Sequence, residues 1–277
     1  MRFGWNAKDA SVRIRGIAKI AAVVLFAIYV AIYIWEPFSE LWNIILTNLL
    51  LVIAAAFAAA LATMIWARYE PEETPRRIWR YFAIGLWSWA VAELIWGYLN
   101  VTQGEVPEGI ADVFWVAAYI FFAHALFIQY RLLAQLGKQE LLSRVSFAIL
   151  GLLVLYFLVY RVLGAGASVE DRLGVAINSF YPVGDLFLAM VAIWLIRHFR
   201  GGAFARPWLG LLPFCFTDFF YAWIVTSGIY AWNMDQTNWW STLFDIAYLG
   251  AYLVLGLGIL SQWAFLKYGL RSSTSTE

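Results

Sequence analysis

Five carboxylic acids stand inside apolar, aromatic stretches of the chain, where a charged group is costly. The stretches are "VAELIWGYL", "ADVFWVAAY", "FYPVGDLFLAM", "FTDFFYAW" and "FDIAYLGAY". The acids in them are Glu93, Asp112, Asp185, Asp218 and Asp245. An ionised carboxylate in hydrocarbon costs a few kcal/mol, so such residues normally face a bundle interior or a water-filled cavity. Protonation, a bound cation, or hydrogen bonds from hydroxyl and amide groups would each stabilise them.

Tyrosine and tryptophan residues accompany the acids at helical spacing. Tyr181 precedes Asp185 by four residues and Tyr248 follows Asp245 by three, so each pair lies on one face of a helix. We interpret the acids and their aromatic neighbours as a binding site for a small molecule or a cation, because aromatic faces attract organic cations. The candidate ligand-binding residues are Glu93, Asp112, Trp115, Tyr119, Tyr181, Asp185, Asp218, Tyr221, Asp245 and Tyr248. The alternative interpretation is that the acids form interhelical hydrogen bonds that fix packing, each worth roughly 0.6 to 2 kcal/mol.

Patterns typical of catalysis or metal binding are missing from the sequence. His124 and His198 fall in different predicted helices, and the single cysteine, Cys215, cannot form an internal disulfide or a thiolate metal site. The sequence has no glycine-rich phosphate loop, no nucleophile elbow and no Cys-x-x-Cys pair. We therefore assign no catalytic residue and no metal ligand, and the sequence identifies no cofactor.

The elements that must position these acids are membrane-spanning helices. Of the 277 residues, 63% are hydrophobic, 13% are charged and 16 are tryptophan, whereas about a quarter of the residues of soluble proteins are charged. Segments apolar enough to cross a membrane, about 20 residues each, occur at 17–35, 42–66, 78–99, 111–131, 145–163, 176–197, 208–230 and 240–266. The sequence therefore predicts an all-α polytopic membrane bundle of eight transmembrane helices. The predicted organisation is a basic N-terminal segment (1–16), an eight-helix domain (17–267) and a short tail (268–277).

Lysine and arginine residues indicate the orientation of the predicted bundle. All 19 of them except Arg161 and Arg172 fall on one side, and cytoplasmic flanks are the ones enriched in these residues. We expect a multi-pass protein of the bacterial cytoplasmic (inner) membrane, surrounded by membrane lipids, with both termini in the cytoplasm. The net charge of +1 and the scatter of the basic residues exclude a nucleic-acid partner, which requires a clustered basic surface.

This orientation places the five acids in the outer half of the membrane. The depth of Asp185 depends on where its helix begins. Pro182 is tolerated in a first turn but kinks a helix interior, so we expect that helix to begin near Ser179. Acids gathered in one half predict an outward-facing polar pocket.

The third and fourth predicted helices resemble the seventh and eighth. In each pair an acid inside one helix is followed by an acid that opens the next helix, with a tyrosine seven residues later. The similarity predicts a duplicated four-helix unit with parallel topology. Repeats of this kind commonly place a binding site at their interface.

The same residues carry a family resemblance over about residues 80–260. The runs "ELIWGYL", "VPEGIADVFWVAAY", "NSFYPVGDLFLAM" and "FTDFFYAW" resemble the multi-span N-terminal membrane sensory domain of bacterial signalling proteins, which precedes GGDEF, EAL or histidine kinase modules. The positions that match its motifs are Glu93, Asp112, Trp115, Tyr181, Pro182, Asp185, Asp218 and Tyr221. Only a short tail follows the last predicted helix, so we expect no output domain. The resemblance implies a sensory or ligand-binding membrane module that stands alone or works through a partner.

Three classes of function follow as hypotheses. The first is a non-enzymatic integral membrane module of sensor-like or accessory type, with an acid-lined pocket in the outer half, that serves signal transduction through a partner protein. The second is a structural subunit of a larger membrane protein complex. The third is a membrane enzyme that acts on lipids with two acids in general acid/base roles, or a proton-coupled transporter.

Overall fold

The structure, a computed structural model, describes residues 7–104, 109–134, 151, 155, 169–200, 202–230 and 238–269. Within these residues the chain forms seven long α-helices and no strand. The long helices are α1 (Ala7–Trp35), α2 (Glu40–Trp66), α3 (Thr74–Gln103), α4 (Ile110–Ala134), α6 (Val169–Phe199), α7 (Arg206–Thr226) and α8 (Trp239–Ala264). A 3-10 turn (Ala203–Ala205) precedes α7, and a π-helical turn (Phe265–Gly269) continues α8.

Each of the seven helices is long and apolar enough to span a membrane. Their spanning segments are 24 to 31 residues long, with mean hydropathy of 1.3 to 2.6, and about 20 residues suffice for a hydrocarbon core. The prediction of an all-α fold is therefore confirmed in the described residues, and their seven apolar helices are compatible with a multi-pass membrane protein. The predicted count of eight is not matched in the described residues. The fifth predicted span, 145–163, lies outside them except for Gly151 and Leu155, which are helical.

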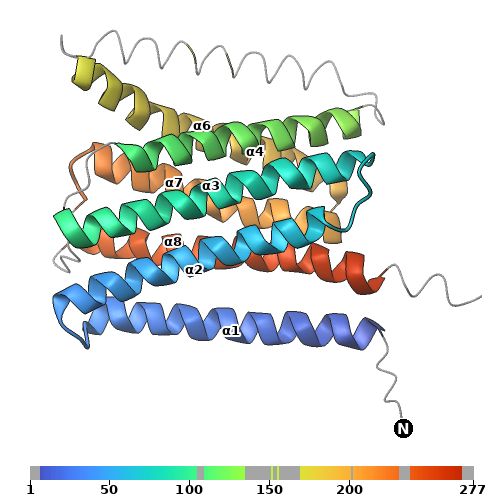
Figure 1. The fold of residues 1–277 in the computed structure, drawn as a ribbon, viewed down its shortest axis with the longest axis horizontal. Helices are drawn as coiled ribbons and strands as arrows, with labels where there is room; N and C mark the ends of the chain where they lie inside the picture. Colours follow the sequence, from blue (N-terminus) through green and yellow to red (C-terminus); the bar gives the residue numbers. More distant parts are fainter. Residues whose placement is uncertain are drawn as a thin grey trace, which may run out of the picture.

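Six of the helices form a closed ring around an aromatic core. The order of neighbours in the ring is α2, α3, α4, α6, α7, α8 and again α2, and α1 packs outside the ring against α8 and α2 (Figure 1). Large rings fill the centre: Trp89 lies 4.8 Å from Phe214 and 6.0 Å from Phe122, measured between ring centroids. All three side chains are 1% exposed or less.

The second half of the ring repeats the arrangement of the first. Helices α2, α3 and α4 run in alternating directions, and so do α6, α7 and α8 (Figure 1). Helix α4 therefore runs parallel to α6, as α8 does to α2, and these parallel contacts join the two sets of three. A ring with this order of contacts is consistent with the pseudo-twofold relation that a parallel duplication would produce.

The two ends of the bundle differ in charge. The described lysine and arginine side chains lie toward the end at which α1 and α7 begin and α8 ends, with the exception of Arg172 near the start of α6. We call the first of these the basic end. The separation agrees with the charge asymmetry predicted from the sequence.

Helix α6 begins earlier than predicted. It starts at Val169, well before Ser179, and Pro182 lies inside it. Proline lacks the backbone N–H that would bond to the carbonyl four residues before it. Pro182 therefore favours a helix start when the sequence is considered alone. The structure shows that flanking turns continue the helix on both sides. Asp185 consequently lies near the middle of α6.

Candidate functional site: a buried carboxyl and tyrosine network

Tyr119 of α4 connects two carboxyl groups from different helices. Its hydroxyl lies 2.6 Å from Oδ1 of Asp185 on α6 and 2.6 Å from Oδ2 of Asp218 on α7. The other oxygen of Asp218, Oδ1, accepts a hydrogen bond of 2.9 Å from Tyr248 of α8. Gly184 makes this approach possible, because a Cβ there would lie 2.7 Å from the ring of Tyr119. We call Asp185, Tyr119 and Asp218 the bridged pair.

The hydrogen count in the bridged pair favours a state in which one of its acids is protonated. A phenol has a single hydrogen, so the hydroxyl of Tyr119 can donate to only one of the two carboxyls. The second 2.6 Å contact is a hydrogen bond only if the other carboxyl is a neutral acid that donates to the phenol oxygen. Two ionised carboxylates in contact with the same phenol oxygen would also repel each other.

Asp218 is better placed to be the ionised carboxylate, and Asp185 is better placed to be the neutral acid. Asp218 is positioned to accept from both Tyr119 and Tyr248, which suits a negative group. Asp185 is 1% exposed and accepts from a single phenol, that of Tyr119. Burial with one phenol donor favours the neutral acid over the anion.

Glu93 forms a second acid site, one layer of rings away. Its Oε1 accepts from the Trp89 indole at 3.1 Å and from the Tyr252 hydroxyl at 2.6 Å. Glu93 is 4% exposed. The ring centroids of Tyr248, which donates to Asp218, and of Tyr252, which donates to Glu93, are 5.3 Å apart. The two acid sites are therefore linked through these two packed rings.

The bonds between the two halves of the ring are reciprocal. Tyr119 on α4 bridges to Asp218 on α7, while Tyr252 on α8 donates to Glu93 on α3. Each tyrosine lies seven residues after the acid near the start of its helix, Asp112 or Asp245. Each mid-helix acid is thus bonded by the tyrosine of the other half.

Asp112 and Asp245 lie near the end of the bundle opposite the basic end. Asp112 Oδ1 accepts from the Tyr181 hydroxyl of α6, and its Oδ2 accepts from the backbone amide of Gly109 at 2.7 Å. The latter bond closes the first turn of α4, so Asp112 both caps its helix and connects it to α6.

Asp245 binds two tyrosines from outside its helix. It accepts from the Tyr33 hydroxyl of α1 and, at 3.1 Å, from the Tyr230 hydroxyl. Tyr230 follows the end of α7, and burial together with the charge of Asp245 raises the pKa of its phenol above the ordinary value. Tyr230 therefore stays neutral and donates. Tyr29 adds a 3.3 Å bond to the backbone oxygen of Asp245.

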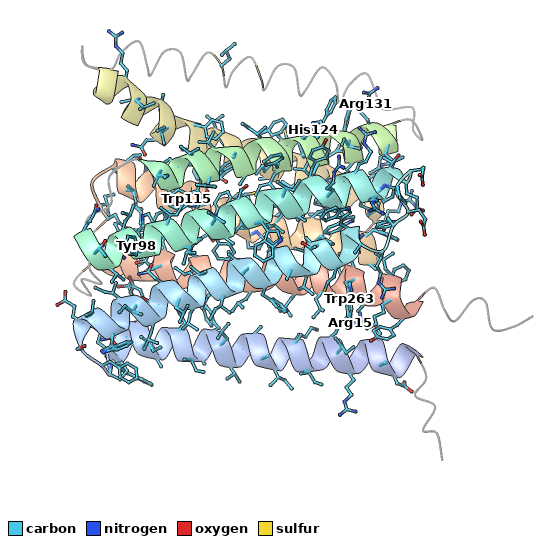
Figure 2. The ribbon with its side chains drawn as sticks, viewed as in Figure 1. Arg15, Tyr98, Trp115, His124, Arg131 and Trp263 are labelled. Atoms are coloured by element: carbon cyan, nitrogen blue, oxygen red, sulfur yellow. The ribbon has the colours of Figure 1, made fainter. Side chains whose placement is uncertain are left out.

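Ring contacts link the acid sites to one another. Tyr221 lies 5.2 Å from Tyr230 and 5.5 Å from Tyr248, between Asp245 and the bridged pair. On the other side Tyr181 lies 6.0 Å from Tyr119 and 6.4 Å from Trp115, between Asp112 and the bridged pair. Trp115, labelled on α4 in Figure 2, adds an indole that interacts with the carboxyl of Glu93.

All ten candidate residues are connected by these bonds and ring contacts, but two predicted pairings are wrong. Asp185 bonds to Tyr119 of α4 rather than to Tyr181 of its own helix, and Tyr248 bonds to Asp218 of α7 rather than to Asp245. A side chain four residues away leans along its own helix, whereas a residue of a facing helix can point straight at the acid. Neighbouring helices supplied better placed donors.

Several participants were missed by the sequence analysis. Tyr252, Tyr33 and Tyr230 each donate to one of the five acids, and Trp89 donates to Glu93. A signal was present for two of them, because Trp89 and Glu93 are four residues apart and Tyr252 is the tyrosine that follows Asp245 by seven in the repeat. Tyr33 and Tyr230 come from α1 and from the segment after α7, and no local spacing points to them.

The chemistry open to this network is proton binding and hydrogen bonding. The partners of the five acids in the described structure are phenols, indoles, one backbone amide and, for Asp185 and Asp218, the other carboxyl, with no lysine or arginine. Among the same residues, no three His, Cys, Asp or Glu side chains come together as a metal site would require. Asp185 and Asp218 are 1% and 7% exposed, so general acid/base chemistry on a substrate would need the helices to part.

Replacing Tyr252 with phenylalanine should test the second acid site. Glu93 would lose its 2.6 Å bond from the phenol and keep its contacts with indoles, at an expected cost of about 1 to 2 kcal/mol. Thermal unfolding of the detergent-solubilised protein should show a midpoint lowered by a few degrees. Tyr98→Phe is the matched control, because Tyr98 is 67% exposed and should leave the midpoint unchanged. Equal midpoints for the two variants would mean that the bond to Glu93 contributes nothing.

Comparison with known proteins adds no relative. No family model, no curated protein and no solved structure matches the chain.

Proposed function

We propose that this protein is a non-enzymatic integral membrane module of sensor-like or accessory type. It registers a proton, or a small polar or cationic molecule, at the carboxyl and tyrosine network and acts through a partner protein. The bacterial cytoplasmic membrane, with both termini in the cytoplasm, is part of the same proposal. It rests on the sequence resemblance and on the charge difference between the ends of the bundle.

The bridged pair is the observation that carries the proposal. Tyr119 contacts two buried carboxyls, from α6 and α7, and Asp185 and Asp218 are only 1% and 7% exposed. Two neighbouring carboxyls around a single phenol offer a proton two alternative positions. Such an arrangement can change state when a proton or ligand arrives.

The position of the bridged pair lets such a change reach the rest of the bundle. Its three residues lie on α4, α6 and α7, and Tyr248 extends it to α8. Helices α4 and α6 form one of the two parallel contacts that join the halves of the ring. A change in these bonds would alter how the halves meet, and with it the loops at either end. If the halves arose by duplication, the site lies at the interface of the repeats, where repeat membrane proteins commonly bind ligands.

Native purification from the source membrane in mild detergent tests the proposal. Mass spectrometry would identify the proteins and small molecules recovered with the wild-type chain, with Asp185→Asn, and with the exposed control Tyr98→Phe. We expect a partner protein with the wild type and the control, together with a small molecule or a partner yield that changes in Asp185→Asn. Recovery that is identical in all three samples would contradict a role for the bridged pair in sensing.

A structural subunit of a membrane complex is the second candidate, and one observation favours it. Each of the five acids accepts a hydrogen bond on at least one oxygen from another helix or a flanking segment, as packing contacts would. Stoichiometric recovery with one large assembly, unaffected by Asp185→Asn and without a small molecule, would support this candidate over the sensor.

A further inference from the structure

A groove at the basic end lies between three helices that present one face each. Helix α8 forms its floor, and α1 and α7 form its walls. Its volume is about 620 Å³, within the roughly 300 to 1,000 Å³ that is usual for small-molecule sites. The lining residues are Val12, Arg15, Gly16 and Lys19 of α1, Arg206, Leu209 and Gly210 of α7, and Val254, Leu257, Gly258 and Ser261 of α8. The spacing within each helix is three or four residues, which places each set on one side.

Three cations and no acid line this groove. Arg15 and Lys19 project from α1 and Arg206 from α7, facing the same space. The Nε of Arg15 donates to the backbone oxygen of Ser11 at 3.2 Å, which orients its guanidinium, and Figure 2 shows Arg15 toward this end of the bundle. No described acidic side chain forms an ion pair with any of the three. Their charges are therefore available to an anion.

The remainder of the groove is apolar and open at the side of the bundle. Val12, Leu209 and Val254 line it with exposures of 57%, 44% and 44%. These side chains belong to membrane-spanning segments, so their exposed faces meet lipid tails. The groove thus joins a cationic region to a hydrocarbon surface, whereas a site for a free anion needs only the cations.

We propose that this groove binds one anionic phospholipid, with the phosphate against Arg15, Lys19 and Arg206 and an acyl chain along Leu209 and Val254. The proposal is independent of the carboxyl network. It requires only that the helices span a membrane. Basic pockets between helices are a recognised means of binding anionic headgroups.

Native mass spectrometry of the full-length protein, titrated with phosphatidylglycerol or phosphatidylcholine of the same acyl chains, tests the proposal. We expect one phosphatidylglycerol to bind more tightly than phosphatidylcholine. Arg15→Gln, Lys19→Gln and Arg206→Gln combined should weaken the phosphatidylglycerol complex at least tenfold, since each cation near an anionic headgroup contributes roughly fivefold. Binding of phosphatidylcholine should stay unchanged.

The matched control removes three exposed cations of the same end, Arg68→Gln, Arg77→Gln and Arg197→Gln. Equal weakening in both triple variants would mean general charge attraction and would overturn the site. So would equal binding of the two lipids by the wild type. Displacement of the bound lipid by inorganic phosphate would assign the groove to a free anion instead.

Two further variants keep the proposal testable if the triple variant fails to fold. Lys19→Gln changes a single exposed residue and should weaken phosphatidylglycerol binding about fivefold. Leu209→Trp narrows the groove and leaves all three charges in place, so it should weaken the same complex through the acyl chain. A melting curve like that of the wild type shows that each variant is folded. Unchanged affinity for phosphatidylglycerol in both variants would refute the lipid site.

Discussion

Asp218→Asn should destabilise the protein by about 2 to 3 kcal/mol, while Asp185→Asn should cost less than about 1 kcal/mol. The two substitutions make the same chemical change in adjoining positions of the bridged pair. Asparagine resembles a neutral acid, because one atom of its amide donates and the other accepts. The difference therefore reports which carboxyl carries the proton.

At position 185 the amide nitrogen can take the place of the acid O–H. It donates to the Tyr119 oxygen, and the phenol continues to donate to Asp218. At position 218 two phenols, those of Tyr119 and Tyr248, converge on the side chain, and an amide offers only one acceptor atom. Tyr119 must then turn toward Asp185, which becomes either an anion with one hydrogen bond or an acid without an acceptor.

The measurement is the unfolding midpoint of both variants in detergent, together with the infrared band of the protonated carboxyl group. Asp218→Asn should melt several degrees below the wild type, and Asp185→Asn close to it. The carboxylic acid band present in the wild type should be lost in Asp185→Asn. If the order of stability is reversed, the proton resides on Asp218 and the roles of the two acids must be exchanged.

The sequence alone located the helices and the acids but not their pairing. Seven predicted spans agree with the structure because length and hydropathy are local properties, and no tertiary information is needed to find them. The acids Glu93, Asp112, Asp185, Asp218 and Asp245 stood out for the same reason: a carboxylate in an apolar helix is visible without a fold.

The donors that stabilise the acids depend on which helices are neighbours. Tyr33 reaches Asp245 because α1 packs on α8, and Tyr252 reaches Glu93 because α8 closes the ring on α2, beside α3. A single sequence carries no record of such contacts. Pro182 misled for a related reason, since the packing of α6 against α7 outweighs the loss of one backbone bond.

Gly258→Ala is expected to destabilise the contact between α7 and α8 by about 3 kcal/mol, at the upper end of the cost of overpacking. A Cβ at this position would overlap the backbone oxygen of Arg206 and lie 3.2 Å from Cα of Pro207. Both are backbone atoms of α7, so no side chain can rotate away. The two helices would have to separate.

Gly210 shows that the close approach is reciprocal. A Cβ there would lie 2.7 Å from Cα of Leu255 and 2.9 Å from the backbone oxygen of Val254, which are atoms of α8. Small residues let membrane helices approach in this way, and dispersion contacts then hold them together. Gly210→Ala should therefore resemble Gly258→Ala in its effect.

Gly256→Ala is the matched control on the same helix, since its Cβ would meet only side chains, those of Phe57 at 3.4 Å and Ala58 at 4.0 Å, which are ordinary contacts. The unfolding midpoint in detergent should fall for Gly258→Ala and remain near the wild type for Gly256→Ala. The infrared band of the bridged pair should also change in Gly258→Ala, because the 2.9 Å bond from Tyr248 to Asp218 spans the same two helices. A lowered midpoint with an unchanged band would show that the network is mechanically isolated from this contact, whereas equal midpoints would show that α7 and α8 are not packed as closely as these distances require.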